Sequence, residues 1–401
     1  MPKLEELKMR IALAGDKELT IAKNIEEITA LRAKWEQFRS GPNSDIEHFI
    51  HVITQDKSVV RPNIVLLQHS GIPVALAVGR IENYTLSCKF GYKSLYNAHT
   101  KALGVVYDGL LGDFSANHSK IILDSLLHTL RQDKLDLLRF SYLRVDSPMH
   151  KLVRKTPNLL ERDHLSSKTL HWRMSVPENI DGFYKSRPKK HRSRIRGLRK
   201  VLENDFPGQV QFKTFVEDIN LDGLIYDCEF IARKTYQKGL GVAFVSIPEM
   251  RQRLRNFADK KQLRAYILYF KNEPVAFWLG RTYGDTFYAT HTGYNPDYKN
   301  YELGTILFIY MLQNLAEKTS IDYIDFGFGD APYKTRFANE CWKEETVYIF
   351  ANSWRGLKLN MIRTLIGISY AGIVNILDRL GVKGKLKKSV RESLSRKLRP
   401  K

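Results

Sequence analysis

THTGYNPDYKNYELGTILFIYMLQNLAEK, residues 290–318, is the stretch that decides the fold. A strand-like segment ends at His291–Gly293, passes through the turn signal Asn295-Pro296-Asp297, and enters an apolar helix at about Gly304 and Thr305. These two residues leave the first backbone amides of the helix uncovered. Uncovered amides and the positive end of the helix dipole form an anion site suited to pyrophosphate. A plain helix start that contains a glycine has the same sequence, so the stretch alone leaves both interpretations open.

A second motif, DFGFGDAPYKTRF, follows at residues 325–337. It combines a strand end, two glycines and four polar side chains, Asp330, Tyr333, Lys334 and Arg336. Open sheets bind ligands where strand ends lie beside helix N-termini, so the motif indicates a binding site. The alternative is structural: Asp330 would cap a turn, and the two basic residues would form a solvated face.

The sequence also repeats itself. Segments 63–85 and 264–286 share Pro-Val-Ala, Gly-Arg and Thr at a constant offset of 201. An apolar helix pattern then recurs at an offset of 185, and a short strand follows in both copies, LDLLRF and IDYIDF. Both copies also keep an Asp-x-Pro, at residues 146–148 and 330–332. Repeats of this length are duplicated domains rather than solenoid units.

Each copy has the same predicted order of elements. Two helices come first, then a hairpin of two apolar strands, a third strand, an amphipathic helix and a short strand. This order is typical of a mixed α+β sheet rather than an alternating βαβ fold. The predicted helices span residues 25–39, 44–57, 221–238 and 248–261, the hairpin turns residues 70–73 and 271–274, and the third strands residues 84–90 and 286–294.

GYNPDYKNYELGTILFIYMLQNLAEK followed by IDYIDFGFGDAPYKTRF resembles the CelD-like, cellulose-biosynthesis-associated branch of the GNAT acyltransferase superfamily, which is related to FemAB-like proteins. A basic helix over residues 186–200 is also similar to the family's. The resemblance covers about residues 170–350, and reaches the first half only through the repeat. The matching positions are Gly293, Tyr294, Pro296, Tyr298, Gly304, Thr305, Gly327, Gly329, Asp330, Pro332, Tyr333 and Lys334.

The resemblance implies tandem GNAT-like acyltransferase folds, each a mixed, mostly antiparallel sheet flanked by helices. We expect a degenerate domain at residues 1–165, a catalytic domain at 166–353 and a basic helical tail at 354–401. The first copy is expected to be degenerate because the stretch before its helix, GDFSANHSK, lacks the Gly-Thr start.

The same resemblance implies transfer of an acyl group from acyl-CoA, as a co-substrate, to an amine or hydroxyl by direct attack. No tightly bound cofactor and no metal are expected. The thioester would lie between two splayed central strands and the pyrophosphate on the helix N-terminus. The loop YELGT at residues 301–305 has fewer glycines than the usual superfamily loop, so weaker CoA binding or another acyl carrier is an alternative. The implied binding residues are Tyr288, Thr290 and Thr292 for pantetheine, Tyr301, Gly304 and Thr305 for pyrophosphate, and Lys334 and Arg336 for CoA phosphate or an anionic acceptor.

Direct acyl transfer needs a base for the nucleophile and an acid for the leaving thiolate. His291 is the candidate base because of its intrinsic pKa, and a histidine hydrogen-bonded within the sheet is the structural alternative. Asp330 is a second candidate base. Tyr333 stands where many superfamily members keep a tyrosine acid, although it would equally suit packing against Phe326 or Phe328.

The excess positive charge, +21 in total, is concentrated in two segments of the sequence. Residues 185–200 carry +9 and residues 355–401 carry +11, so the rest of the 401 residues is nearly neutral. Two basic patches suggest docking of an anion, a membrane surface or RNA rather than general coating of nucleic acid.

The apolar stretch 365–377, too short by itself for a transmembrane span, predicts either an amphipathic helix on an anionic membrane or a helix packed on the body. Three scattered cysteines fit a reducing compartment, so we expect a cytoplasmic protein, with peripheral attachment to the inner face of the membrane as the alternative.

The leading hypothesis is an acyl-CoA-dependent transferase that acts on a small molecule, a sugar, a polysaccharide precursor or an amine. The second is a Fem-like aminoacyl transferase that uses aminoacyl-tRNA, with the basic helix holding RNA. The third is a non-catalytic binding protein in envelope-polysaccharide assembly.

Overall fold

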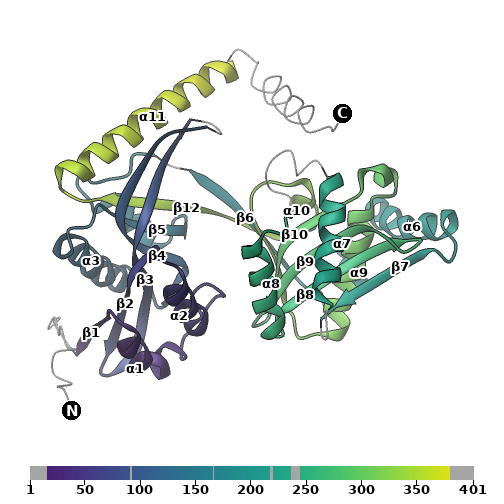
Figure 1. The fold of residues 1–401 in the computed structure, drawn as a ribbon, viewed down its shortest axis with the longest axis horizontal. Helices are drawn as coiled ribbons and strands as arrows, with labels where there is room; N and C mark the ends of the chain where they lie inside the picture. Colours follow the sequence, from purple (N-terminus) through teal and green to yellow (C-terminus); the bar gives the residue numbers. More distant parts are fainter. Residues whose placement is uncertain (1–15, 91–92, 166, 217–219, 236–243, 380–401) are drawn as a thin grey trace. The chain divides into compact units, whose positions relative to one another are not determined.

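The computed structural model describes residues 16–379, except for 91–92, 166, 217–219 and 236–243 (Figure 1). The fold is α+β with a mixed sheet, as the sequence predicts, and its twelve named strands lie in the described residues. The chain forms two compact units. Within the described residues, unit 1 takes 16–169 and 342–379, and unit 2 takes 170–341.

Unit 1 contains six strands in the order β1-β2-β3-β4-β5-β12. Neighbours pair antiparallel, except for the parallel pair β4–β5. The bounds are β1 (Lys17–Ala22), α1 (Ile25–Trp35), α2 (Ile46–Gln55), β2 (Val59–His69), β3 (Ile72–Phe90), β4 (Lys93–Gly112), α3 (Ala116–Gln132), β5 (Leu137–Arg144), α4 (Pro148–Lys155), β12 (Glu340–Phe350) and α11 (Trp354–Arg379).

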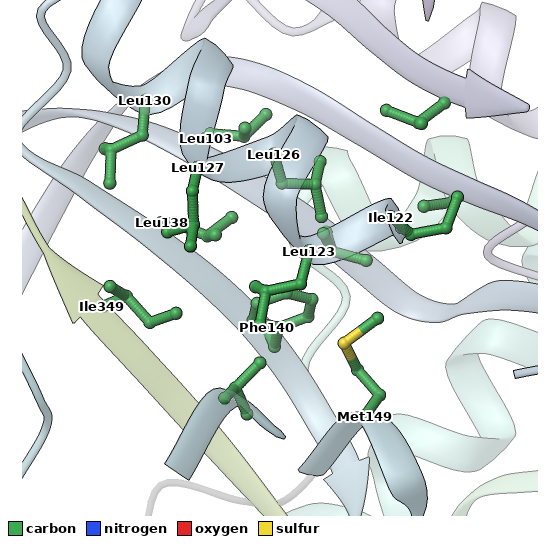
Figure 2. Packing of buried hydrophobic residues seen from close by; sticks show 14 of the residues in the cluster. Leu103, Ile122, Leu123, Leu126, Leu127, Leu130, Leu138, Phe140, Met149 and Ile349 are labelled. Carbon is green, nitrogen blue, oxygen red and sulfur yellow. The ribbon is translucent and has the colours of Figure 1, made fainter. Parts of the chain in front are cut away.

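The main core of unit 1 lies between α3 and the sheet (Figure 2). Apolar residues of α3 recur every three or four positions, which places one face of the helix against β4, β5 and β12. Leu123 and Leu126 are fully buried beside Phe140 of β5 and Ile349 of β12. Helices α1 and α2 pack against a separate apolar cluster around Trp35 and Phe49.

Unit 2 repeats this strand order as β7-β8-β9-β10-β11-β6, again with one parallel pair, β10–β11. The bounds are β6 (Lys168–Ser175), α5 (Ile180–Lys185), α6 (Lys189–Asp205), β7 (Val210–Phe215), α7 (Leu221–Lys234), α8 (Pro248–Asp259), β8 (Leu263–Phe270), β9 (Glu273–Tyr283), β10 (Thr286–Tyr294), a 3-10 turn (Pro296–Tyr301), α9 (Leu303–Lys318), β11 (Tyr323–Phe328) and α10 (Pro332–Phe337).

Alternate residues of β8 face two different cores. Tyr266 and Leu268 join the cluster formed with α5, α6 and α9, whereas Ala265 and Ile267 join the cluster formed with α7 and α8. Because successive side chains of a strand point to opposite faces, the helices of unit 2 cover both faces of its sheet.

The shared strand order confirms the tandem fold that the repeat predicts. The hairpin turns match residue by residue, because Ser70-Gly71 and Lys271-Asn272 all adopt positive φ, between 50° and 80°. The sixth strand of each unit comes from the other half of the sequence. Strand β6 follows the first copy along the chain but pairs with β11 of unit 2, and β12 follows the second copy but pairs with β5 of unit 1.

One predicted strand is wrong. Residues 84–90 do not form a separate third strand, because β3 continues through them without a turn as far as Phe90. The segment Ile81–Thr85 contains no glycine or proline that could break the strand. The third strand of the first copy is therefore β4, whereas that of the second copy is β10, as predicted.

Candidate active site in unit 2

The two central strands of unit 2 separate part of the way along. Strands β10 and β11 pair only from Thr286↔Tyr323 to Tyr288↔Asp325, although β10 continues to Tyr294. A bulge at Ala289–His291 disturbs the pairing of β10 with β9 on its other side. The parallel strands therefore splay beyond Tyr288 and Asp325.

Gly280 of β9 permits this arrangement. A Cβ at Gly280 would lie 2.1 Å from the Tyr288 carbonyl oxygen, a distance that no side chain tolerates. The Gly-Arg shared by both repeats has a similar reason in unit 1, where a Cβ at Gly79 would lie 3.1 Å from the Asn63 carbonyl oxygen.

The N-terminus of α9 has no side-chain cap. Its N-cap residue, Glu302, adopts the left-handed conformation with φ of 50°, and its side chain makes no capping hydrogen bond. In unit 1 the corresponding helix α3 is capped by Ser115, whose hydroxyl accepts a hydrogen bond from the His118 amide. A Cβ at Gly304 would meet only the Tyr294 ring, at 3.8 Å, so the protein itself leaves room there. Uncapped amides with open space in front of them form an anion site.

Two arginines contact this helix start. Arg336 of α10 donates to Thr305 Oγ1 at 3.2 Å and to Glu302 Oε2 at 3.3 Å. Arg194 of α6 donates to the same Glu302 oxygen at 2.6 Å. Burial lowers the pKa of His191, and the charges of Arg194, Arg187 and Arg336 lower it further. The basic helix predicted over residues 186–200 therefore lies beside α9, where it adds positive charge to the anion site.

The predicted pantetheine residues lie along β10 at the bulge. Thr290 and Thr292 donate their hydroxyls to the carbonyls of Leu279 and Phe277 on β9, each at 3.0 Å. Tyr288, the last residue paired with β11, is half-buried. The threonine hydroxyls therefore stabilise the bulge. A ligand at this position would contact the backbone of β10.

Tyr301 is the last residue of the 3-10 turn, and its side chain packs against the end of α6. Its hydroxyl donates to Asp205 at 2.9 Å, and its ring packs edge-on against Phe206. It therefore anchors the loop that leads into α9.

His291 faces the α7–α8 side of the sheet. Its ring meets Phe244 edge-on at 5.4 Å, and its Nδ1 is 3.2 Å from the Thr290 hydroxyl. Burial, with a contribution from the charge of Arg253, lowers the pKa of His291 to about 4. The imidazole is therefore neutral at pH 7 and able to accept a proton.

Asp330 and Tyr333 differ in their surroundings. Asp330 is exposed in the loop between β11 and α10. Tyr333 is half-buried, and its ring packs edge-on against Trp278 at 5.3 Å and against Phe326 at 6.0 Å. The aromatic packing considered from the sequence is thus present with Phe326. In unit 1 the equivalent position is Met149, which lies in the core and has no ionisable group.

Lys334 points inward. Only 6% of its surface is exposed, and its Nζ donates to the Phe328 carbonyl. Burial lowers its pKa to about 8, while the Asp325 charge acts in the opposite direction.

Two features close to this motif were not predicted from the sequence. His171 of β6 is buried, and its Nε2 lies 2.9 Å from both carboxylate oxygens of Asp325. Trp278 of β9 is also buried, and its indole Nε1 has no acceptor among the described residues. Nothing in the alternating segment KTLHWRMS distinguishes His171, because its partner lies 154 residues away.

Comparisons with known proteins give one family match and similar solved folds. Residues 189–335 match the family model described as acetyltransferase (GNAT) domain. No match is found among curated proteins. The structure is similar to FemX, with a TM-score of 0.53 at 10% identity over 82% of this chain and 98% of FemX.

Two other solved structures have lower scores. A tandem GNAT protein from the clavulanic acid biosynthesis pathway has a TM-score of 0.47 at 11% identity, over 84% of this chain and 99% of its own. L-PGS from Bacillus licheniformis has a TM-score of 0.46 at 13% identity, over 84% of this chain and 96% of L-PGS. The family match spans α6 to α10, which includes the splayed strands and the uncapped helix. Residues 189–335, which form most of unit 2, therefore match a GNAT acetyltransferase domain.

Proposed function

We propose that unit 2 transfers an acyl group from acyl-CoA to an amine or hydroxyl by direct attack. The observation that carries the proposal is the uncapped start of α9, which lies among Arg194, Arg336 and His191 next to the splay of β10 and β11. An anion site beside an opening between strands suits a ligand with a pyrophosphate at one end and a thioester at the other.

The binding mode follows from this geometry. The pyrophosphate would accept hydrogen bonds from the first amides of α9, in the space in front of Gly304. Arg336 would turn part of its hydrogen bonding from Glu302 to the phosphate, because a doubly charged group attracts it more strongly. The pantetheine arm would run along the β10 backbone past the bulge and place the thioester beside Trp278.

The chemistry uses two proton transfers. The acceptor nitrogen or oxygen attacks the thioester carbonyl, the new C–N or C–O bond forms, and the C–S bond breaks. His291 is the proposed base because its imidazole is unprotonated at neutral pH; the burial that lowers its pKa to about 4 also weakens it as a base, so it takes the proton of the acceptor only as the new bond forms and the acceptor becomes more acidic. Tyr333 protonates the leaving thiolate and recovers its proton from solvent. The unpaired Trp278 N–H is suited to hydrogen-bond the oxyanion that forms during the attack.

The acceptor would approach from the α7–α8 side of the sheet, which His291 faces. We propose a small-molecule, sugar or polysaccharide-precursor acceptor. The exposed Asp330 is the second candidate for the base and would serve an acceptor that reaches the β11–α10 loop.

Isothermal titration of the full chain with acetyl-CoA and with a longer acyl-CoA tests the donor. We expect at least one of the two to bind with a submillimolar dissociation constant. If neither acetyl-CoA nor the longer acyl-CoA binds, the proposal is contradicted. Turnover is then compared between wild type and the double variant His291→Ala/Asp330→Ala. Full turnover by the double variant would show that neither residue is the base.

Aminoacyl-tRNA is a second candidate donor, because α6 carries exposed Lys189, Lys190 and Lys200 beside the same site. Most arginines of α6 favour the CoA proposal, because they already pair with carboxylates, as Arg196 does with Asp181 and Arg199 with Glu203. Competition by tRNA, with a steep loss of binding as salt rises, would favour the aminoacyl transferase instead.

A further inference from the structure

Helix α11 has two contrasting faces. One face is held on unit 1 by polar contacts. Asn360 donates to the carbonyls of Leu160 and Arg162 at 2.7 and 2.8 Å, and Arg363 pairs with the buried Asp163. Figure 1 shows α11 as a long helix that joins the rest of unit 1 through β12.

The opposite face is apolar and uncovered. Leu365, Ile368 and Ile376 each expose between 58% and 60% of their surface, and Met361 exposes a similar fraction. These positions recur at helical spacing, so they form one stripe along the helix. We call these four residues the α11 stripe. Apolar side chains gathered on one face in this way mark an interaction surface.

Further exposed apolar groups lie next to α11. Leu159 and Leu160 are exposed, and the Leu160 carbonyl is bonded to Asn360. Near the other end, Tyr370 packs edge-on against Phe90 of β3, at 5.2 Å, and Leu95 of β4 is exposed. Asn360 and Tyr370 lie on the face of α11 that is held on unit 1, so these exposed groups flank the helix and the stripe itself is its exposed apolar face.

The sequence of α11 and of the residues that follow it is basic. Lys358 and Arg379 are exposed on α11, and residues 381–401 contain nine Lys or Arg and one acid in their sequence. A second copy of the chain would bring the same positive charge to the same place and be repelled. Anionic lipid headgroups have the complementary charge, and the acyl region below them accepts the apolar side chains.

We propose that the α11 stripe docks unit 1 on an anionic lipid bilayer, with the helix lying in the interface. By length and composition alone, the 23 residues Trp354–Ile376 would suffice to cross a membrane, and only 11% of the most apolar window is buried. Crossing would remove Arg363 from Asp163 and place it in hydrocarbon, which is costly. The helix therefore keeps its polar face on unit 1 and presents the stripe to lipid.

Vesicle flotation of the full chain tests the proposal. We expect the protein to float with mixed phosphatidylcholine–phosphatidylglycerol vesicles, to float less with phosphatidylcholine alone, and to be released by high salt. Leu365→Glu/Ile368→Glu should weaken flotation by at least about tenfold. Ile72→Glu is the matched control, since Ile72 is 67% exposed at the β2–β3 turn, and it should float like wild type.

Thermal unfolding of each variant shows whether unit 1 remains folded. We expect it to remain folded, because all the substituted residues are exposed. Failure of the wild-type chain to float would overturn the proposal, as would equal flotation of the double variant. Resistance of the bound protein to alkaline carbonate would show that α11 spans the bilayer instead. If the wild-type chain does not float but forms a dimer, and the double variant is a monomer, the stripe binds a second copy of the chain instead.

Discussion

Arg336 reaches the start of α9, whereas Lys334, two residues earlier, points into unit 2. The sequence predicts both as phosphate ligands, yet only the guanidinium lies beside the anion site. We expect Arg336→Gln to weaken acetyl-CoA binding by about 1.5–3 kcal/mol, the value of a hydrogen bond to a charged group. Calorimetric titration measures this loss.

Lys334→Met is the matched comparison. This substitution should change the affinity for acetyl-CoA much less, because the ammonium of Lys334 is already bonded to the Phe328 carbonyl. Thermal unfolding checks that the variant is folded. The assignment would be refuted if the Lys334 variant lost as much affinity as the Arg336 variant.

His291 makes stability depend on pH. Its pKa is about 4 in the folded protein, mainly through burial, and about 6.5 when unfolded. Between these values the unfolded chain binds the extra proton, so the free energy of unfolding falls as pH decreases from 6.5 to 4. The contribution that is lost is at most about 3 kcal/mol. Urea unfolding at several pH values should show that His291→Asn has a shallower decline than wild type, and equal slopes would contradict the assignment.

Residues were predictable from the sequence where local chemistry was enough. The turn and helix start around Gly304 and the Tyr333 motif are local patterns, and the structure places both at the splay of β10 and β11. The pairing of His171 with Asp325 depends on β6, which reaches unit 2 from the end of the first copy. The direction of Lys334 depends on packing, which its charge alone did not indicate.

At the scale of elements, the splay depends on how closely β9 and β10 approach each other. Gly280→Ala would place a methyl group 2.1 Å from the Tyr288 carbonyl oxygen. We expect it to destabilise unit 2 by about 1–3 kcal/mol, as overpacking does, and to weaken acetyl-CoA binding. Gly197→Ala in α6, where no atom lies within 4 Å of the new methyl, should instead be neutral or stabilising. Chemical denaturation compares the two, and an unaffected Gly280 variant would refute the role of this close approach.

Helices and hairpins followed their sequence signals closely. Helix α8 begins at Pro248 as predicted, and β10 spans the predicted residues 286–294. The basic helix begins at Lys189, after Pro188, and runs on to Asp205. The length of β3 was not predictable from its own segment, because the hydrogen bonds of its second half come from β4.

At the scale of the molecule, each unit is completed by a strand from the other half of the sequence. Val347 and Ile349 of β12 are fully buried in the core of unit 1. A chain of residues 1–165 alone would lack them and expose the edge of β5. We expect this fragment to be unfolded or aggregated by circular dichroism and sedimentation, whereas the full chain melts cooperatively. A stable, monomeric fragment would show that β12 is dispensable.

We expect unit 2 alone to bind the acyl donor, and titration of the full chain with acetyl-CoA measures the number of sites. We predict one site per chain. Gly304→Asp should weaken binding at least about tenfold through repulsion, while the added carboxylate stabilises the start of α9 by about 0.3–1 kcal/mol. Ala116→Asp, the matched change at the start of α3, should bind like wild type, because Ser115 already caps that helix. Two sites per chain, or unchanged binding by the Gly304 variant, would contradict the account.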